Sequence, residues 1–263
     1  MNVTILFFST NRLEYLIPTL ESFHTKINFG DLDLTKILID DYPNGRDDSL
    51  FYKIKKQYSI DELILHPENK GQSATWSEAW EHVPEKTNYI WHQEDDFVFP
   101  NQVEVKHLID LHEALPRSLA QICLKRQVWY NDGTDFITKI ENGAVGHEIP
   151  IMIGDRKENL ILHQHYFNAN PCIYPRWIIE EEYSHNPQES VIINDLKNKY
   201  GETVQSAIYG KRLDPPLCEH IGYYNQGRKV LENEPGWDWL KDYDASKKYY
   251  SQKYLKEYDK KIN

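Results

Sequence analysis

The chain has 263 residues, and 30 Lys and Arg against 41 Asp and Glu give it a formal net charge of −11 at pH 7. This length allows one large domain or two closely joined halves, with enough buried surface for a core without disulfides. The acidic balance disfavours non-specific binding to nucleic acid or anionic lipid, no apolar run approaches the roughly 20 residues of a membrane span, and an aromatic content of 13% excludes a disordered acidic tail.

The three cysteines, Cys123, Cys172 and Cys218, have no C-x-x-C spacing. They therefore indicate neither a disulfide framework nor a cysteine zinc site. The apolar run at 3–8 is too short for the apolar core of a signal peptide, and no basic segment precedes it. We expect a cytoplasmic protein without a membrane span.

The first hundred residues alternate short apolar runs with helical patterns, which predicts an α/β fold with a parallel sheet. Ser9, Thr10 and Asn11 are expected to cap the first helix. The expected strands lie at 3–8, 36–39, 63–66 and 89–92, and the expected helices at 13–24, 49–58 and 73–82.

The periodicity weakens after Pro100. A helix is expected at 103–115, a strand or strand pair at 119–128, a turn-rich region compatible with a hairpin at 133–154, an extended segment at 167–175, a helix at 189–200 and a C-terminal helix from 237 onward. No internal repeat or linker is evident. The simplest division is one compact domain with two functional halves, 1–100 and 101–230, and a C-terminal helical extension at 231–263.

Polar residues follow each of the four early strands. In an open α/β sheet the ligand crevice lies beyond the carboxyl ends of the strands, so we expect these residues to converge. They are Thr10 and Arg12 after the first strand, Asp40 and Asp41 after the second, Asn69 and Gly71 after the third, and Glu94, Asp95 and Asp96 after the fourth.

The triplet Glu94-Asp95-Asp96 comes just after the expected strand at 89–92, whose apolar residues are typical of a buried strand. Crowded carboxylates repel one another unless a cation neutralises them, and oxygen ligands without cysteine favour Mg²⁺ or Mn²⁺. The alternative is an ordinary solvated acidic loop.

Taken in order, these segments resemble the GT-A fold glycosyltransferases, particularly the family-2-like enzymes that use nucleotide-sugars. The matching pieces are Phe8-Ser9-Thr10-Asn11-Arg12, Ile39-Asp40-Asp41, Asn69-Lys70-Gly71 and, in place of the D-x-D metal motif, Glu94-Asp95-Asp96. The resemblance implies a mostly parallel, Rossmann-like central sheet flanked by helices. It also implies that Thr10, Arg12, Asp40 and Asp41 hold the nucleoside, that Asn69 and Gly71 shape the pocket, and that the triplet holds Mn²⁺ or Mg²⁺.

Two later segments fit the same resemblance. His220, in a H-x-G segment, resembles the C-terminal metal histidine of many GT-A enzymes, although a lone histidine is also a common core residue. Arg228 and Lys229 follow a flexible Gly227 and could reach a diphosphate, or could form a solvated basic turn.

An inverting transfer needs a general base on the acceptor hydroxyl. Glu189 opens a predicted helix and resembles the acceptor-side acid of this superfamily; the alternative is a simple helix-dipole partner. Asp195 is the fallback, and Glu180, Glu181 and Glu182 are weaker candidates. Other acceptor-side candidates are the N-P segment with Asn168, Asn170 and Pro171, and four aromatic residues that could stack on a sugar or belong to the core: Trp129, Tyr130, Tyr166 and Trp177.

The sequence thus favours a metal-dependent glycosyltransferase that uses a nucleotide-sugar, with UDP preferred, and a glycan or related hydroxyl acceptor. Residues 241–263 carry seven Lys, four acids and five Tyr, which indicates either a helix docked on the domain or a contact for an anionic acceptor. Because some viral enzymes of the class that this sequence resembles glycosylate hydroxymethylated DNA bases, modified DNA is an alternative acceptor. A nucleotidyltransferase is disfavoured because Phe8–Arg12 lacks glycine, and a non-catalytic sugar- or nucleotide-binding module is the second alternative. The sugar, the acceptor and the oligomeric state stay open.

Overall fold

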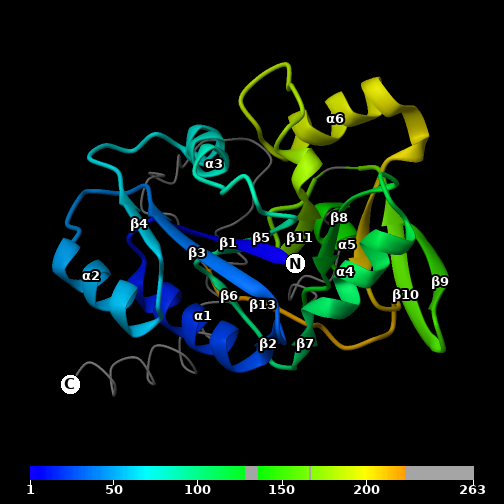
Figure 1. Cartoon of the computed structure of the whole chain (residues 1–263), viewed down its shortest axis with the longest axis horizontal. Helices are drawn as coiled ribbons and strands as arrows, with labels where there is room; N and C mark the ends of the chain where they lie inside the picture. The colour runs from blue at the N-terminus through cyan, green and yellow to red at the C-terminus, as the bar shows by residue number, and fades with distance from the viewer. Residues whose placement is uncertain (128–135, 166, 223–263) are drawn as a thin grey trace.

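A nine-stranded sheet forms the centre of the protein in a computed structural model that describes residues 1–127, 136–165 and 167–222. The strands lie side by side in the order β4-β3-β1-β5-β11-β8-β12-β10-β9 (Figure 1). In that order their bounds are Glu62–Leu65, Asp33–Asp40, Asn2–Ser9, Tyr89–Glu94, Cys172–Pro175, Leu119–Leu124, Gln205–Tyr209, Arg156–His163 and His147–Ile153.

The sheet is mostly parallel in its first half and mixed in its second. Strands β4, β3, β1 and β5 are all parallel neighbours. Strand β11 runs antiparallel to both β5 and β8, β12 is parallel to β8, and β10 and β9 form an antiparallel hairpin at the edge. The predicted α/β fold with a mostly parallel central sheet is confirmed.

Helices cover both faces of the sheet and bury two separate apolar cores. The first core includes residues of α1 (Leu13–Lys26), α2 (Asp48–Gln57) and α4 (Val105–Ala114), and the second includes residues of α3 (Gln72–Glu81) and α6 (Glu189–Tyr200). Strand β1 supplies both cores in alternation, because successive side chains of a strand point to opposite faces. Figure 1 shows α3 and α6 together on one side of the sheet, and α1 and α2 on the other.

Two small two-stranded sheets complete the described fold. Strand β2 (Ile27–Asn28) pairs with β7 (Val103–Glu104), and β6 (Phe97–Val98) pairs with β13 (Glu219–His220). The other elements are α5 (Phe136–Glu141) and the 3₁₀ turns η1 (Arg176–Ile178) and η2 (Gly201–Thr203). None of the helices within the described residues is long and apolar enough to cross a membrane.

The expected elements of the first hundred residues and the helix at 189–200 are confirmed, with small shifts at their ends. The expected cap of the first helix is wrong. Arg12 is the N-cap of α1 and no side-chain oxygen caps the helix, because residues 10–12 are engaged with carboxylates at the strand ends. Asn11 takes a positive φ of 57° to make that turn. The expected helix from residue 237 lies outside the described residues.

Candidate active site

Arg12 lies between two carboxylates of the acidic triplet. Its guanidinium donates to both carboxylate oxygens of Asp95 and, at 2.8 Å, to Oδ2 of Asp96. Burial alone would lower the pKa of Arg12, but the charges of Asp95 and Asp96 outweigh burial and hold that pKa above its ordinary value. The Thr10 amide also donates to Asp95, at 3.1 Å, so the turn after β1 closes onto the end of β5. The triplet is therefore not a solvated loop: Asp95 and Asp96 are 2% and 4% exposed.

The segment 219–222 approaches the same carboxylates from the other end of the chain. Strand β13 pairs with β6 so that His220 lies opposite Phe97, and Nε2 of His220 lies 3.2 Å from Oδ2 of Asp96. The Ile221 amide donates to the Asp96 carbonyl at 2.8 Å. A Cβ at Gly222 would lie 2.0 Å from Oδ2 of Asp96, so only glycine lets the backbone pass here. The structure thus brings together His220 and Asp96, the two residues expected to share a metal ion.

Lys125, at the end of β8, holds the segment that leads to His220. Its ammonium group donates to the carbonyls of Lys211, Arg212 and Asp214, and its own carbonyl accepts from the amides of Leu217 and Cys218 at 2.8 and 3.2 Å. Residues 211–218 are thereby fixed on the sheet, and β13 starts from a defined position.

Asp40 and Asp41 organise the loops that follow β3 and β4. Asp40 is fully buried, and its carboxylate accepts from the amides of Asn11 and Tyr42 and from the guanidinium of Arg46, at 2.6, 3.2 and 3.0 Å. This enclosure leaves Asp40 no access to a ligand, so the direct nucleoside contact expected of it is not supported by the structure.

Asp41 shapes the turn after β4. It accepts from the amides of Lys70 and Gly71 at 2.8 and 2.7 Å and contacts Nδ1 of His66 at 2.7 Å. Three bonds leave a carboxylate with acceptor capacity for one more donor. Gly71 adopts a φ of 80° that suits glycine, and Asn69 is exposed, with its side chain making no hydrogen bond to another described residue.

Glu94 is the last residue of β5 and bonds to the start of α3. Its carboxylate accepts from Gln72, the first residue of α3, at 3.3 Å. Burial and the nearby charge of Asp96 raise the pKa of Glu94 to about 7. An added positive charge nearby would therefore stabilise the ionised form of the Glu94 carboxylate.

Glu189 stands at the first turn of α6, as expected. Its carboxylate accepts from the Ala169 amide at 3.0 Å, and its carbonyl accepts from the Phe167 amide at 3.1 Å, so the segment before β11 is tied to the start of the helix. Burial, helped by the charges of Glu141 and Glu94, raises the pKa of Glu189 to about 8. Strand β11 starts with Cys172 opposite His92 of β5, so the segment to which Glu189 is bonded lies at the edge of the sheet where β5 leads into the triplet.

Asp195 lies elsewhere. Its carboxylate accepts from the amide and the hydroxyl of Ser184, at 2.6 and 3.2 Å, and so fixes the loop before α6. Six residues along a helix correspond to about 9 Å and to a different face, so the structure does not bring Asp195 to Glu189. In the acceptor-side segment the Asn168 side chain accepts from the Asn170 amide at 2.9 Å, and Trp177 packs against Tyr200 in the core.

Five expected site residues lie outside the described part of the chain: Arg228, Lys229, Trp129, Tyr130 and Tyr166.

The residues at the triplet suit a divalent cation. Oδ1 of Asp96 is buried and has no hydrogen-bond partner among the described residues, and the imidazole of His220 lies beside Oδ2. The described residues contain no group of three or more His, Cys, Asp or Glu arranged as a complete metal site. Mg²⁺ and Mn²⁺ are commonly held by one or two carboxylates together with substrate phosphates, so a partial protein ligand set fits them.

Three residues of the site escaped sequence reasoning: Arg46, His66 and Gln72. Each acts by neutralising or positioning a carboxylate that the sequence did identify. Gln72 directly follows the Asn69-Lys70-Gly71 loop, which is a signal that could have found it. Arg46 lies in a turn and His66 at a strand end, where sequence spacing gives no partner.

Comparison with solved structures identifies the architecture. TarS from S. aureus, residues 1–349, superposes with a TM-score of 0.53 over 84% of this chain and 60% of its own length, at 11% identity. GalNAc-T7, solved with UDP, GalNAc and Mn²⁺, superposes with a TM-score of 0.59 over 97% of this chain and 49% of its own length, also at 11% identity. The chain has the GT-A fold.

A further TarS structure, in complex with UDP-GlcNAc, aligns with this GT-A fold at a TM-score of 0.54 and 10% identity, over 83% of this chain and 58% of its own. The chain thus spans about half to three fifths of these GT-A proteins. No family model and no curated protein matches the sequence.

Proposed function

We propose that this protein is a metal-dependent glycosyltransferase that moves a sugar from a nucleotide-diphosphate donor to an acceptor hydroxyl with inversion at the anomeric carbon. The observation that carries the proposal is that His220 lies beside Asp96 after β5, while Glu189 is bonded to the segment before β11, which starts opposite the end of β5 in a GT-A sheet. UDP is the preferred nucleotide, because the structures similar to this one were solved with UDP or a UDP-sugar.

Binding of the nucleoside would fall to Asp41 and Thr10. Asp41 keeps acceptor capacity for one more donor, such as a base N–H, and Oγ1 of Thr10 is buried without a hydrogen-bond partner in the described residues. Asp40 would act indirectly by fixing Asn11 and Arg46. Gly71 would let the chain turn close to the bound nucleoside.

Asp96 and His220 would hold Mn²⁺ or Mg²⁺, with Glu94 close enough to respond to its charge. Such a cation neutralises the diphosphate, so that the leaving group needs no proton from an acid. Arg12 pairs with Asp95 and Asp96 and holds both carboxylates in place on the protein side of the site.

Glu189 would act as the general base. Its carboxylate takes the proton of the acceptor hydroxyl while the acceptor oxygen forms a bond to the anomeric carbon and the bond to the diphosphate oxygen breaks. A pKa of about 8 suits this task, because a base is most effective when its pKa lies near the working pH.

The first test is hydrolysis and transfer of UDP-sugars with and without Mn²⁺. Glu189→Gln is expected to lower transfer by at least about 100-fold, the typical contribution of a general base, while the exposed Glu182→Gln should leave transfer unchanged. A product with the donor's anomeric configuration, or an unimpaired Glu189→Gln rate, would remove Glu189 from the base role.

A second variant tests the metal site. Asp96→Ala is expected to abolish turnover and Mn²⁺ binding while the far-ultraviolet circular dichroism spectrum stays that of the wild type. Sugar transfer by this variant at the wild-type rate would rule out the assignment of Asp96.

A further inference from the structure

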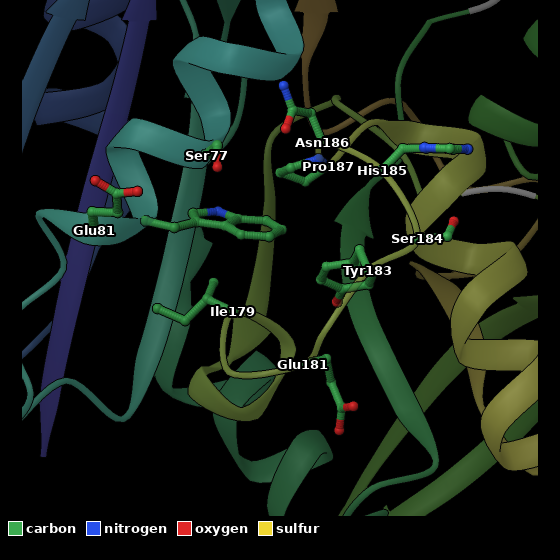
Figure 2. A pocket seen from close by; sticks show the side chains of 10 residues that line it. Ser77, Glu81, Ile179, Glu181, Tyr183, Ser184, His185, Asn186 and Pro187 are labelled. Carbon is green, nitrogen blue, oxygen red and sulfur yellow. The ribbon is translucent and has the colours of Figure 1, made fainter.

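A pocket of about 560 Å³ lies outside the residues discussed above, between the second half of α3 and the segment 179–187 that leads into α6. Its size falls within the range of small-molecule sites. Figure 2 shows Ser77 and Glu81 on one wall and Tyr183, Asn186 and Pro187 on the other. Trp80 also lines it.

Both walls of the pocket lead back to the candidate active site. The helix α3 begins at Gln72, which bonds Glu94, and Ser77 follows five residues later, or about 8 Å along the helix. On the other wall, Pro187 precedes Glu189 by two residues through the extended Gln188, which separates their Cα atoms by at most about 7 Å. A chain-like substrate could therefore reach from Glu189 into the pocket.

The wall formed by residues 179–187 is held in place by the protein itself. Ser184 is bonded through its amide and hydroxyl to Asp195, the Tyr183 hydroxyl donates to the Ile178 carbonyl at 2.6 Å, and Glu181 pairs with Lys199. A wall that is already ordered loses little conformational entropy when a ligand binds.

The lining suits a carbohydrate. The rings of Trp80 and Tyr183 lie 5.9 Å apart with a tilt of 47°, and such rings offer apolar faces to the C–H surface of a sugar. Around them Glu81, His185 and Asn186 are exposed, and their side chains make no hydrogen bond with other described residues. They provide both donors and acceptors for hydroxyl groups.

The charge of the lining excludes a polyanion. The ionisable side chains that line the pocket are Glu81, Glu181 and His185, and the nearby Lys199 is paired with Glu181. A phosphate backbone would meet carboxylates here without a free cation among these residues, at a cost in Coulomb energy.

We propose that this pocket is an acceptor subsite for a neutral oligosaccharide, which binds there with the sugar units beyond the one that reacts at Glu189. The proposal rests on the proposed glycosyltransferase function and names its acceptor class. DNA and other polyanionic acceptors are excluded from this subsite.

The test is binding of the labelled protein to a printed array of neutral and anionic glycans, followed by kinetics with the best acceptor. Glu81→Ala and Asn186→Ala are each expected to raise the acceptor KM about tenfold, equivalent to about 1.4 kcal/mol, without changing the rate of UDP-sugar hydrolysis. The matched controls are Glu85→Ala and Asn198→Ala, which are exposed and lie outside the pocket.

The outcomes separate the two proposals. Three results would overturn the subsite and leave the proposed glycosyltransferase function intact. They are UDP-sugar hydrolysis without binding to any neutral glycan, preferential binding to anionic glycans, and an acceptor KM that the two pocket variants leave unchanged. If the wild-type protein shows no Mn²⁺-dependent UDP-sugar hydrolysis, the proposed function is overturned, and the subsite with it.

Discussion

Arg12 offers the sharpest test of how the acidic triplet is held. We consider Arg12→Met, which keeps the length of the side chain and removes its charge. In the wild type Arg12 is 8% exposed, and its guanidinium contacts Asp95 and Asp96 and lies 5.4 Å from the centre of the Tyr15 ring. The substitution leaves two buried carboxylates without their cation.

Removing one partner of a buried ion pair costs about 3–5 kcal/mol. For a chain of this size each kcal/mol lowers the melting temperature by about 2–4 °C, so Arg12→Met is expected to lower it by about 6–20 °C. The control is Arg156→Met. The side chain of Arg156 is 34% exposed, and a partly exposed pair contributes only about 1 kcal/mol or less.

Mn²⁺ should act differently on the wild type and on Arg12→Met. Arg12 occupies Oδ2 of Asp96, so its removal should make the carboxylates more receptive to an added cation. A ligand at 100 times its Kd stabilises a protein by about 2.7 kcal/mol. We expect Mn²⁺ to raise the melting temperature of Arg12→Met by more than that of the wild type in a thermal-shift titration. Equal shifts, or a variant as stable as Arg156→Met, would refute this account of the triplet.

Two further predictions concern stability and metal affinity. Because the pKa of folded Glu189 is raised to about 8, the folded state binds more protons than the unfolded state between pH 4.5 and 8, and this group's contribution to stability falls as pH rises through that window. The melting temperature of Glu189→Gln should therefore exceed that of the wild type by an increasing margin from pH 5 to pH 9. A margin that stays constant with pH would contradict the buried position of Glu189. Gly222→Ala places a methyl group 2.0 Å from Oδ2 of Asp96, which should cost about 1–3 kcal/mol of stability through overpacking. Calorimetry should also find Mn²⁺ binding at least about tenfold weaker than in the wild type. An unchanged Mn²⁺ affinity would show that the segment around Gly222 moves freely, contrary to this prediction.

The first half of the fold is predictable because its central strands, β1 and β5, are buried on both faces. Strand β1 is a continuous apolar run, and a run of that kind between turn residues has few other interpretations. The edge strand β9 alternates exposed and partly buried residues, and its sequence predicts only a turn-rich region compatible with a hairpin, without the bounds of the two strands. Strand β12 and helix α5 are short and carry no such signal, and both went unpredicted.

The site follows the same division. Its carboxylates stand out in the sequence because like charges are crowded after apolar runs. The partners of these carboxylates do not stand out, because the fold brings them together from separate parts of the chain. Arg12, Arg46 and His66 are separated in sequence from the carboxylates that they contact by 83, 6 and 25 residues. Sequence reasoning assigned Arg12 to the nucleoside, whereas the structure places its guanidinium on the triplet.

Lys125 gives the site a mechanical consequence. Its ammonium group and its carbonyl together hold residues 211–218, the stretch that delivers His220 to Asp96. Cation binding at His220 and the ordered state of residues 211–218 are thermodynamically linked. If the ordered stretch favours cation binding by a given free energy, the bound cation stabilises the ordered stretch by the same free energy. The amides of Leu217 and Cys218 should then exchange with deuterium more slowly once the cation is bound, so that occupancy of the site can be followed from residues that do not touch it.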